Sequence, residues 1–115
     1  MANTFKVVTK ANVTSADVIY TVAGSTTTVV LGLILGNTTS GATTATVSLG
    51  SDTSGRAGNN DEANQTVELV TSVSIPGNSS LELMSGNKIV METTDTLSVT
   101  AGASTDVVLS IMEIT

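Results

Sequence analysis

Cysteine and histidine are both absent from this 115-residue sequence. Without cysteine, the chain has no disulfide, no thiol nucleophile and no cysteine-ligated zinc site. Without histidine, it lacks the commonest general base and the commonest metal ligand. We therefore expect that the chain is not an enzyme and that it has no catalytic residues and no cofactor.

Aromatic and charged residues are also scarce, at 2% and 12% of the chain, and the only rings are Phe5 and Tyr20. The net charge is −6, with no basic stripe that could neutralise phosphates, so we expect no nucleic-acid partner. The longest apolar run, 29–35, is far shorter than the ~20 residues that span a bilayer, and the first residues lack the order of a signal peptide. We therefore expect no membrane partner and synthesis in a cytoplasm.

The remaining polar residues offer little catalytic chemistry. A serine nucleophile would need Lys6, Lys10 or Lys88 as its base, and no Ser-x-x-Lys spacing occurs. A carboxylate pair could support glycoside hydrolysis. However, all four glutamates within the strand patterns are expected at the outward, solvated phase: Glu68, Glu82, Glu92 and Glu113.

Valine, leucine, isoleucine and threonine alternate with period two from end to end, which predicts strands and no helix. We expect about eight: 17–22, 27–36, 42–49, 65–75, 80–84, 88–92, 96–101 and 106–114. Strands at this spacing, separated by Gly, Asn and Pro turns, favour a single all-β domain over 1–115, an antiparallel β-sandwich of jelly-roll type. An immunoglobulin-like sandwich is the alternative, and residues 1–16 are left open as an extended N-terminal arm.

Four of these segments have patterns that assign faces. In 27–36, Val29, Leu31, Leu33 and Leu35 are expected on one face and Val30 and Ile34 on the other, as in a central strand covered on both faces. In 42–49, Ala45, Val47 and Leu49 are expected inward. In 65–75, one face is expected to carry Val67, Leu69, Thr71, Val73 and Ile75.

The fourth, the last strand, is apolar on both faces. Val107, Leu109 and Ile111 share one face, and the other carries Val108, Met112 and Ile114. One face belongs to the core. The second is either covered by the N-terminal segment 5–8 or meets a neighbouring subunit, so we predict Val108, Met112 and Ile114 as interface residues.

The polar stretch 51–64 gathers six oxygen-bearing side chains: Asp52, Asn59, Asn60, Asp61, Glu62 and Asn64. Calcium binds oxygen ligands of this kind, but the EF-hand spacing with its central glycine and terminal glutamate is missing. We therefore favour a solvated contact loop without a metal, with Asn59, Asn60 and Asp61 as further interface candidates.

The C-terminal half carries a recognisable order of strands and turns. Ile75-Pro-Gly-Asn-Ser-Ser-Leu-Glu-Leu is followed by Ser85-Gly-Asn-Lys-Ile-Val, Thr94-Asp-Thr-Leu-Ser-Val and Val107-Val-Leu-Ser-Ile-Met-Glu-Ile. This order resembles the small virion proteins of tailed bacteriophages, particularly those of marine bacteria. The opening Met-Ala-Asn-Thr-Phe-Lys, with Tyr20-Thr-Val-Ala and Thr27-Thr-Val-Val-Leu-Gly-Leu, is similar too.

The resemblance implies a virion structural protein, made in the host bacterial cytoplasm and located in the virion. The expected function is that of a head decoration or cement subunit that binds the capsid surface by protein–protein contacts. The alternative is a tail, neck or fibre component that acts as a receptor- or carbohydrate-binding module. The expected partners are the major capsid protein or tail proteins, and the chain is expected to form a homo-oligomer, with a trimer favoured.

Overall fold

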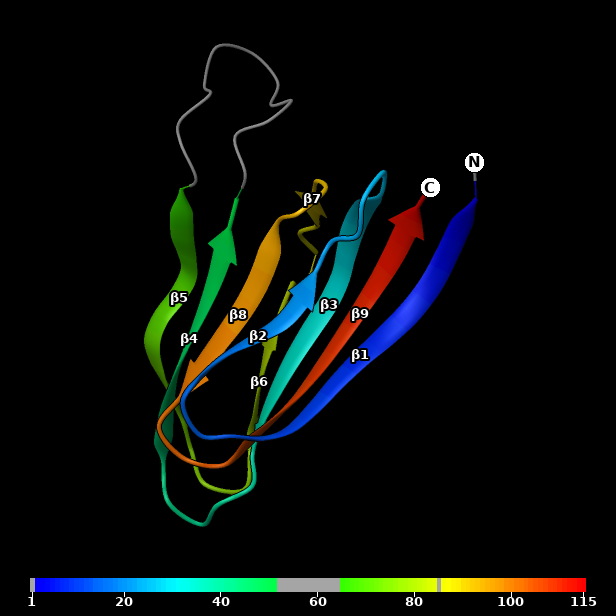
Figure 1. Cartoon of the computed structure of the whole chain (residues 1–115). Helices are drawn as coiled ribbons and strands as arrows, with labels where there is room; N and C mark the ends of the chain where they lie inside the picture. The colour runs from blue at the N-terminus through cyan, green and yellow to red at the C-terminus, as the bar shows by residue number, and fades with distance from the viewer. Residues whose placement is uncertain (1, 52–64, 85) are drawn as a thin grey trace.

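The computed structural model describes residues 2–51, 65–84 and 86–115, which form nine strands and no helix (Figure 1). The strands are β1 (Asn3–Val13), β2 (Ala16–Thr21), β3 (Thr27–Asn37), β4 (Thr43–Gly50), β5 (Thr66–Ile75), β6 (Ser80–Leu83), β7 (Ile89–Met91), β8 (Thr96–Ala101) and β9 (Thr105–Ile114). The eight strands expected from the sequence correspond to β2–β9. The ninth, β1, lies within residues 1–16, for which the sequence allows an extended N-terminal arm.

The strands form two antiparallel sheets packed face to face. One sheet has the order β1-β9-β3-β6, with β7 also paired to β3, and the other has the order β2-β8-β4-β5. Strands β6 and β7 both pair with β3, so they can be taken as two halves of one interrupted strand. Apart from the link between these halves, only the β4–β5 connection stays within one sheet, and every other connection crosses to the opposite sheet. This winding is that of a jelly roll rather than of an immunoglobulin-like sandwich, in which consecutive strands often pair within a sheet. The all-β sandwich expected from the sequence is confirmed.

Strands β4 and β8 follow the simple alternation that the sequence predicts. Ala45 and Val47 of β4 are buried and Leu49 is partly buried, while Thr46 and Ser48, which lie between them, face outward. Leu97, Val99 and Ala101 of β8 pair with these three residues across the sheet and are buried too. Here, period two holds over the whole strand because no bulge falls between the two central strands of this sheet.

Strand β3 departs from the expected pattern because its pairing with β9 shifts between Val30 and Gly32. Leu31 is the extra residue of this β-bulge, and a bulge reverses the faces of all residues beyond it. The buried residues are therefore Val30, Leu33 and Leu35, not the predicted set that begins at Val29. The prediction that β3 is covered on both faces is also wrong, because Ile34 is exposed on the outer side.

Strand β5 lies at an edge of its sheet and contains two irregularities in its pairing with β4. One of them includes Ser72, whose φ of 48° lies in the left-handed region and whose amide donates to Thr46 Oγ1. The single apolar face predicted for 65–75 is therefore broken. Ile75 is buried, Val67 and Thr71 are exposed, and Val70 pairs with Val47 instead.

The space between the sheets is filled almost entirely by aliphatic side chains. Fifteen residues form this core: Val13, Val22, Val30, Leu33, Leu35, Ala45, Val47, Ile75, Met91, Leu97, Val99, Ala101, Val107, Leu109 and Ile111. Full burial of each Val, Leu, Ile or Met side chain contributes roughly 1.5–3 kcal/mol to folding. The core therefore stabilises the sandwich without a buried phenylalanine or tryptophan.

At the end of the sandwich where β3 stops, the buried Asn37 side chain joins two turns. Its Nδ2 donates to the carbonyl oxygens of Gly41 at 2.8 Å, Ile75 at 3.0 Å and Pro76 at 3.3 Å. Its Oδ1 accepts hydrogen bonds from the amide and hydroxyl of Thr39. One side chain thus holds together the 38–42 connection and the 76–79 turn.

The two ends of the described chain lie side by side at the opposite end of the sandwich (Figure 1). The amide of Ala2 donates to the carbonyl of Thr115 at 3.1 Å, and the amide of Thr115 donates to the carbonyl of Ala2 at 3.0 Å. These bonds continue the β1–β9 pairing to the last residue.

Candidate assembly surface

The outer face of the five-stranded sheet carries an unbroken apolar row across four strands. Phe5 of β1 pairs with Met112 of β9, Met112 pairs with Val29 of β3, and Val29 pairs with Val90 of β7. Directly opposed residues on one face of a sheet have their side chains in contact range. Phe5 and Val90, at the two ends of the row, are 72% and 59% exposed.

A second part of the same face lies further along β9 and β3. Val108 pairs with Ile34, and these side chains are 38% and 40% exposed. Glu82 of β6 pairs with Ile34 on its other side, so that a carboxylate borders the apolar surface there. We call the outer surface formed by Phe5, Val7, Val29, Ile34, Val90, Val108 and Met112 the apolar face.

The outer face of the other sheet has the opposite character. Thr46 pairs with Thr100 and Ser48 with Ser98 across β4 and β8, which gives a hydroxyl-lined surface. Val18 of β2, beside Ser98, and Val67 of β5 are exposed valines of this sheet. Because both sheets pack on the same core, burial within the chain does not explain why only one of them is apolar on its outside.

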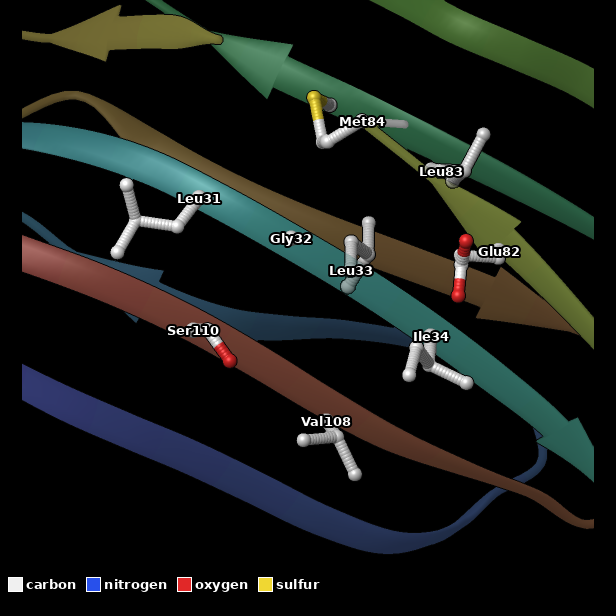
Figure 2. A pocket seen from close by; sticks show the side chains of 9 residues that line it. All are labelled: Leu31, Gly32, Leu33, Ile34, Glu82, Leu83, Met84, Val108 and Ser110. Atoms are coloured by element: carbon white, nitrogen blue, oxygen red, sulfur yellow. The ribbon is translucent and has the colours of Figure 1, made fainter. Parts of the chain in front are cut away.

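A pocket of about 260 Å³ opens on the apolar face between β9, β3 and β6 (Figure 2). Figure 2 places Gly32 near its middle, with side chains from all three strands around it. The pocket is lined by Leu31, Gly32, Leu33, Ile34, Glu82, Leu83, Met84, Val108 and Ser110. Its walls are thus mainly aliphatic, and its polar side chains are one carboxylate and one hydroxyl.

A polar cluster lies between the sheets near the chain ends and corrects one expectation from the sequence. Glu113 was expected to be solvated, but it points inward and its side chain is only 13% exposed. Its Oε1 lies 2.7 Å from Lys6 Nζ, and its Oε2 accepts a 2.5 Å hydrogen bond from the Tyr20 hydroxyl. Thr28 Oγ1 lies 2.7 Å from the same hydroxyl and, because a phenol has one proton to give, Thr28 is the donor there.

These contacts shift the ionisation of two groups. Hydrogen bonds from Lys6 and Tyr20 favour the carboxylate and hold the pKa of Glu113 below its ordinary value of 4.5. Burial, together with the bond to Glu113, raises the pKa of Tyr20 to about 12. The cluster therefore keeps one negative and one positive charge beside a neutral phenol at neutral pH, which suits a structural clamp between the sheets.

Three of the predicted interface residues, Val108, Met112 and Ile114, all lie at the outward phase of β9. The other three, Asn59, Asn60 and Asp61, lie outside the described residues. The proposed cover for this face is wrong, because residues 5–8 pair beside β9 instead of lying over it. Phe5 and Val7 therefore enlarge the exposed apolar surface. Neither they nor Val90 could be predicted as part of it, because periodicity does not show which strands are neighbours.

Within the described ranges, no group of three or more acidic side chains is placed to hold a metal ion. The same part of the chain contains no helix long and apolar enough to cross a membrane. The fold and its surface thus define a jelly-roll sandwich with one apolar and one hydroxyl-rich outer face.

No family model and no curated protein matches the chain. A search of solved structures finds a chain of Bacillus endospore appendages, described as a family of disulfide-linked pili. The two align with a TM-score of 0.48 and 17% sequence identity, over 99% of this chain and 87% of the other. The present sequence contains no cysteine.

Proposed function

We propose that the chain is a structural subunit of a bacteriophage particle, a head decoration protein that binds the capsid surface through its apolar face. The observation that carries the docking part of this proposal is the row from Phe5 through Met112 and Val29 to Val90. Exposed apolar patches of this kind mark contact surfaces in soluble proteins. The phage assignment rests on the sequence resemblance, which spans most of the chain.

The chemistry of the chain fits such a role. A decoration subunit needs a stable scaffold and a contact surface, and it needs no titratable nucleophile. Among the described residues, the two with a shifted pKa are Glu113, whose pKa is lowered, and Tyr20, whose pKa is raised, and these two residues hold the sheets together. Location in the virion, with the major capsid protein as the partner, follows from this proposal.

The alternative, a carbohydrate-binding module at a tail or fibre, has weaker support. Sugar sites commonly stack the ligand on exposed aromatic rings. Tyr20 is engaged between the sheets, which leaves Phe5 as the one exposed ring of the chain. A glycan array with specific binding, lost on Phe5→Ala, would favour this alternative.

The test is an add-back experiment with particles that lack the chain. Purified wild-type chain should cosediment with such particles, whereas the double variant Val108→Lys, Met112→Lys should stay in the supernatant because two ammonium groups cannot be buried on an apolar surface. Val18→Lys is the matched control, since Val18 is an exposed strand valine (56%) on the opposite sheet. Equal cosedimentation of the double variant and the wild type would remove the proposed docking surface.

Two further observations bear on the same proposal. Mass spectrometry of purified particles should detect the chain, and its absence from them would overturn the virion assignment. A gene position beside the major capsid gene is expected for a decoration protein, whereas a position among tail genes would favour the alternative.

The trimer remains part of the proposal. Light scattering on the purified chain should give about three times its mass of 11.6 kDa. A monomer at all accessible concentrations would remove the trimer from the proposal and leave the docking face untouched.

A further inference from the structure

The pocket on the apolar face exists because a glycine stands where the neighbouring strand positions carry side chains. Gly32 pairs with Ser110 of β9 and lies next to the Leu31 bulge of β3. A Cβ atom built on Gly32 would meet no atom within 4 Å, so the space above it is open. Ile34 and Val108, two residues further along their strands, form one wall of the hollow.

The backbone does not require glycine at this position. Gly32 does not have a left-handed φ, and no other backbone lies within 4 Å of the position that its Cβ would take. Glycine inside a strand costs roughly 0.5–1 kcal/mol relative to alanine, and it often marks a place where another molecule approaches closely. The missing side chain therefore has one evident effect, which is to keep the hollow open.

The size of the hollow limits what it can hold. Pockets for drug-sized ligands measure roughly 300–1,000 Å³. At about 260 Å³, this one lies below that range and suits a single side chain of a docking protein.

The lining selects which side chain that is. Leu31, Ile34 and Val108 present aliphatic surface, while Glu82 supplies a carboxylate and Ser110 a hydroxyl. Among the residues that the structure describes, no ion pair to Glu82 is found, whereas Lys6 is paired with Glu113 and Lys10 with Asp17. Long basic side chains lay their methylene stems on apolar surface and keep the charged head at a polar group.

We propose that the hollow over Gly32 receives one arginine or lysine side chain of the docking protein, with its stem against Ile34 and Val108 and its cation at the Glu82 carboxylate. This inference rests on the proposed function, because it names the chemistry of the partner that the apolar face binds. The partner at the hollow is a virion protein rather than a second copy, because a second copy would bring a net charge of −6 to a site whose one charged lining group is the Glu82 carboxylate. Arginine fits better than lysine because its planar fork can pair with a carboxylate through two hydrogen bonds.

The experiment is an NMR titration of the isotope-labelled chain with two peptides, acetyl-Ile-Arg-Ile-amide and acetyl-Ile-citrulline-Ile-amide. Citrulline has the shape of arginine without its charge. The arginine peptide should shift the signals of Gly32, Ile34, Val108 and Ser110, and the citrulline peptide should bind about fivefold more weakly, the upper end for a partly exposed ion pair.

Three variants separate the contributions. Glu82→Gln should lower the affinity for the arginine peptide by the same factor and leave the affinity for the citrulline peptide unchanged. Glu68→Gln is the control, because Glu68 is an exposed strand glutamate of the other sheet. Gly32→Val should fill the hollow and abolish the shifts from both peptides, while its signal dispersion shows that the fold is retained.

Each other outcome overturns the inference. Equal affinity for both peptides would show that the hollow does not select a cation. Peptide-induced signal shifts confined to residues outside the hollow would show that the hollow is not the binding site. Concentration-dependent shifts at Gly32 and Ile34 without peptide would show that a second copy is the occupant. If particles bind Glu82→Gln as tightly as wild type but fail to bind the Val108→Lys, Met112→Lys variant, the apolar face is supported as the docking surface and the basic side chain in the hollow is contradicted.

Discussion

Tyr20 of β2 and Glu113 of β9 join the two sheets through a 2.5 Å hydrogen bond from the phenolic hydroxyl to the carboxylate. Removing this hydroxyl with Tyr20→Phe leaves Glu113 and Thr28 without their shared partner. Because hydrogen bonds to charged groups contribute about 1.5–3 kcal/mol, we expect a loss of about 2 kcal/mol in the free energy of unfolding. Urea unfolding followed by circular dichroism measures this loss, and an unchanged midpoint with an unchanged slope would show that the contact is not stabilising.

The same pair predicts how stability depends on pH. The pKa of Glu113 is lower in the folded chain than its ordinary value of 4.5, so its contribution is present above pH 4.5 and is lost as the pH falls below that value toward the folded pKa. The pKa of Tyr20 is raised to about 12, so its contribution is present below its ordinary pKa of 10.0 and is lost as the pH rises through 12. In a plot of the unfolding midpoint against pH, Glu113→Gln should reduce the fall of the midpoint on the acid side. Tyr20→Phe should reduce the fall on the alkaline side. Identical acid limbs in wild type and Glu113→Gln would show that other carboxyl groups set the acid sensitivity.

Asn37→Asp tests the side chain that joins two turns. The substitution keeps the size and the Oδ1 acceptor but replaces the Nδ2 donor with an oxygen facing the carbonyls of Gly41, Ile75 and Pro76. A buried donor lost against several acceptors costs about 1–3 kcal/mol, and more where a charge is introduced, so we expect about 3 kcal/mol. Asn78→Asp, at an exposed turn position, is the control and should change the unfolding free energy little.

Two glycines should respond in opposite ways to alanine. A Cβ at Gly77 would lie 2.1 Å from the carbonyl oxygen of Ser40, so the 76–79 turn could no longer pack on residues 40–41. Gly77→Ala should destabilise the chain by more than about 2 kcal/mol. Gly32→Ala should be neutral or stabilise it by up to about 1 kcal/mol, since its Cβ meets open space. Thermal unfolding of the two variants side by side checks this contrast, and a destabilised Gly32→Ala would show that the position is strained.

The strand positions were predictable from the sequence because turns and period-two runs are local features. Strand β8 was expected over 96–101 and is found over Thr96–Ala101, between two sharp turns. The buried faces were predictable only where the pairing has no bulge. The Leu31 bulge reversed the expected faces of β3, and a bulge depends on the partner strand, which periodicity does not contain.

The apolar face was partly visible in the sequence. The second face of the last strand pointed to Val108 and Met112, but Phe5 and Val90 join them only through pairing between distant segments. Glu113 could have been found, since it shares the phase of Val107, Leu109 and Ile111, all of which point inward. Its inward phase was overlooked because a charged residue at the end of a strand usually faces solvent.

The hydrogen-bonded pair formed by Ala2 and Thr115 bears on how the chain can be re-engineered. Because these residues are adjacent, a short glycine-serine linker could fuse them into a continuous backbone, and new ends could be opened at the exposed residues 23–25. Such a circular permutant would keep both sheets and the core while moving its free ends to another connection. A reporter attached there would report on docking from a different position on the same sandwich.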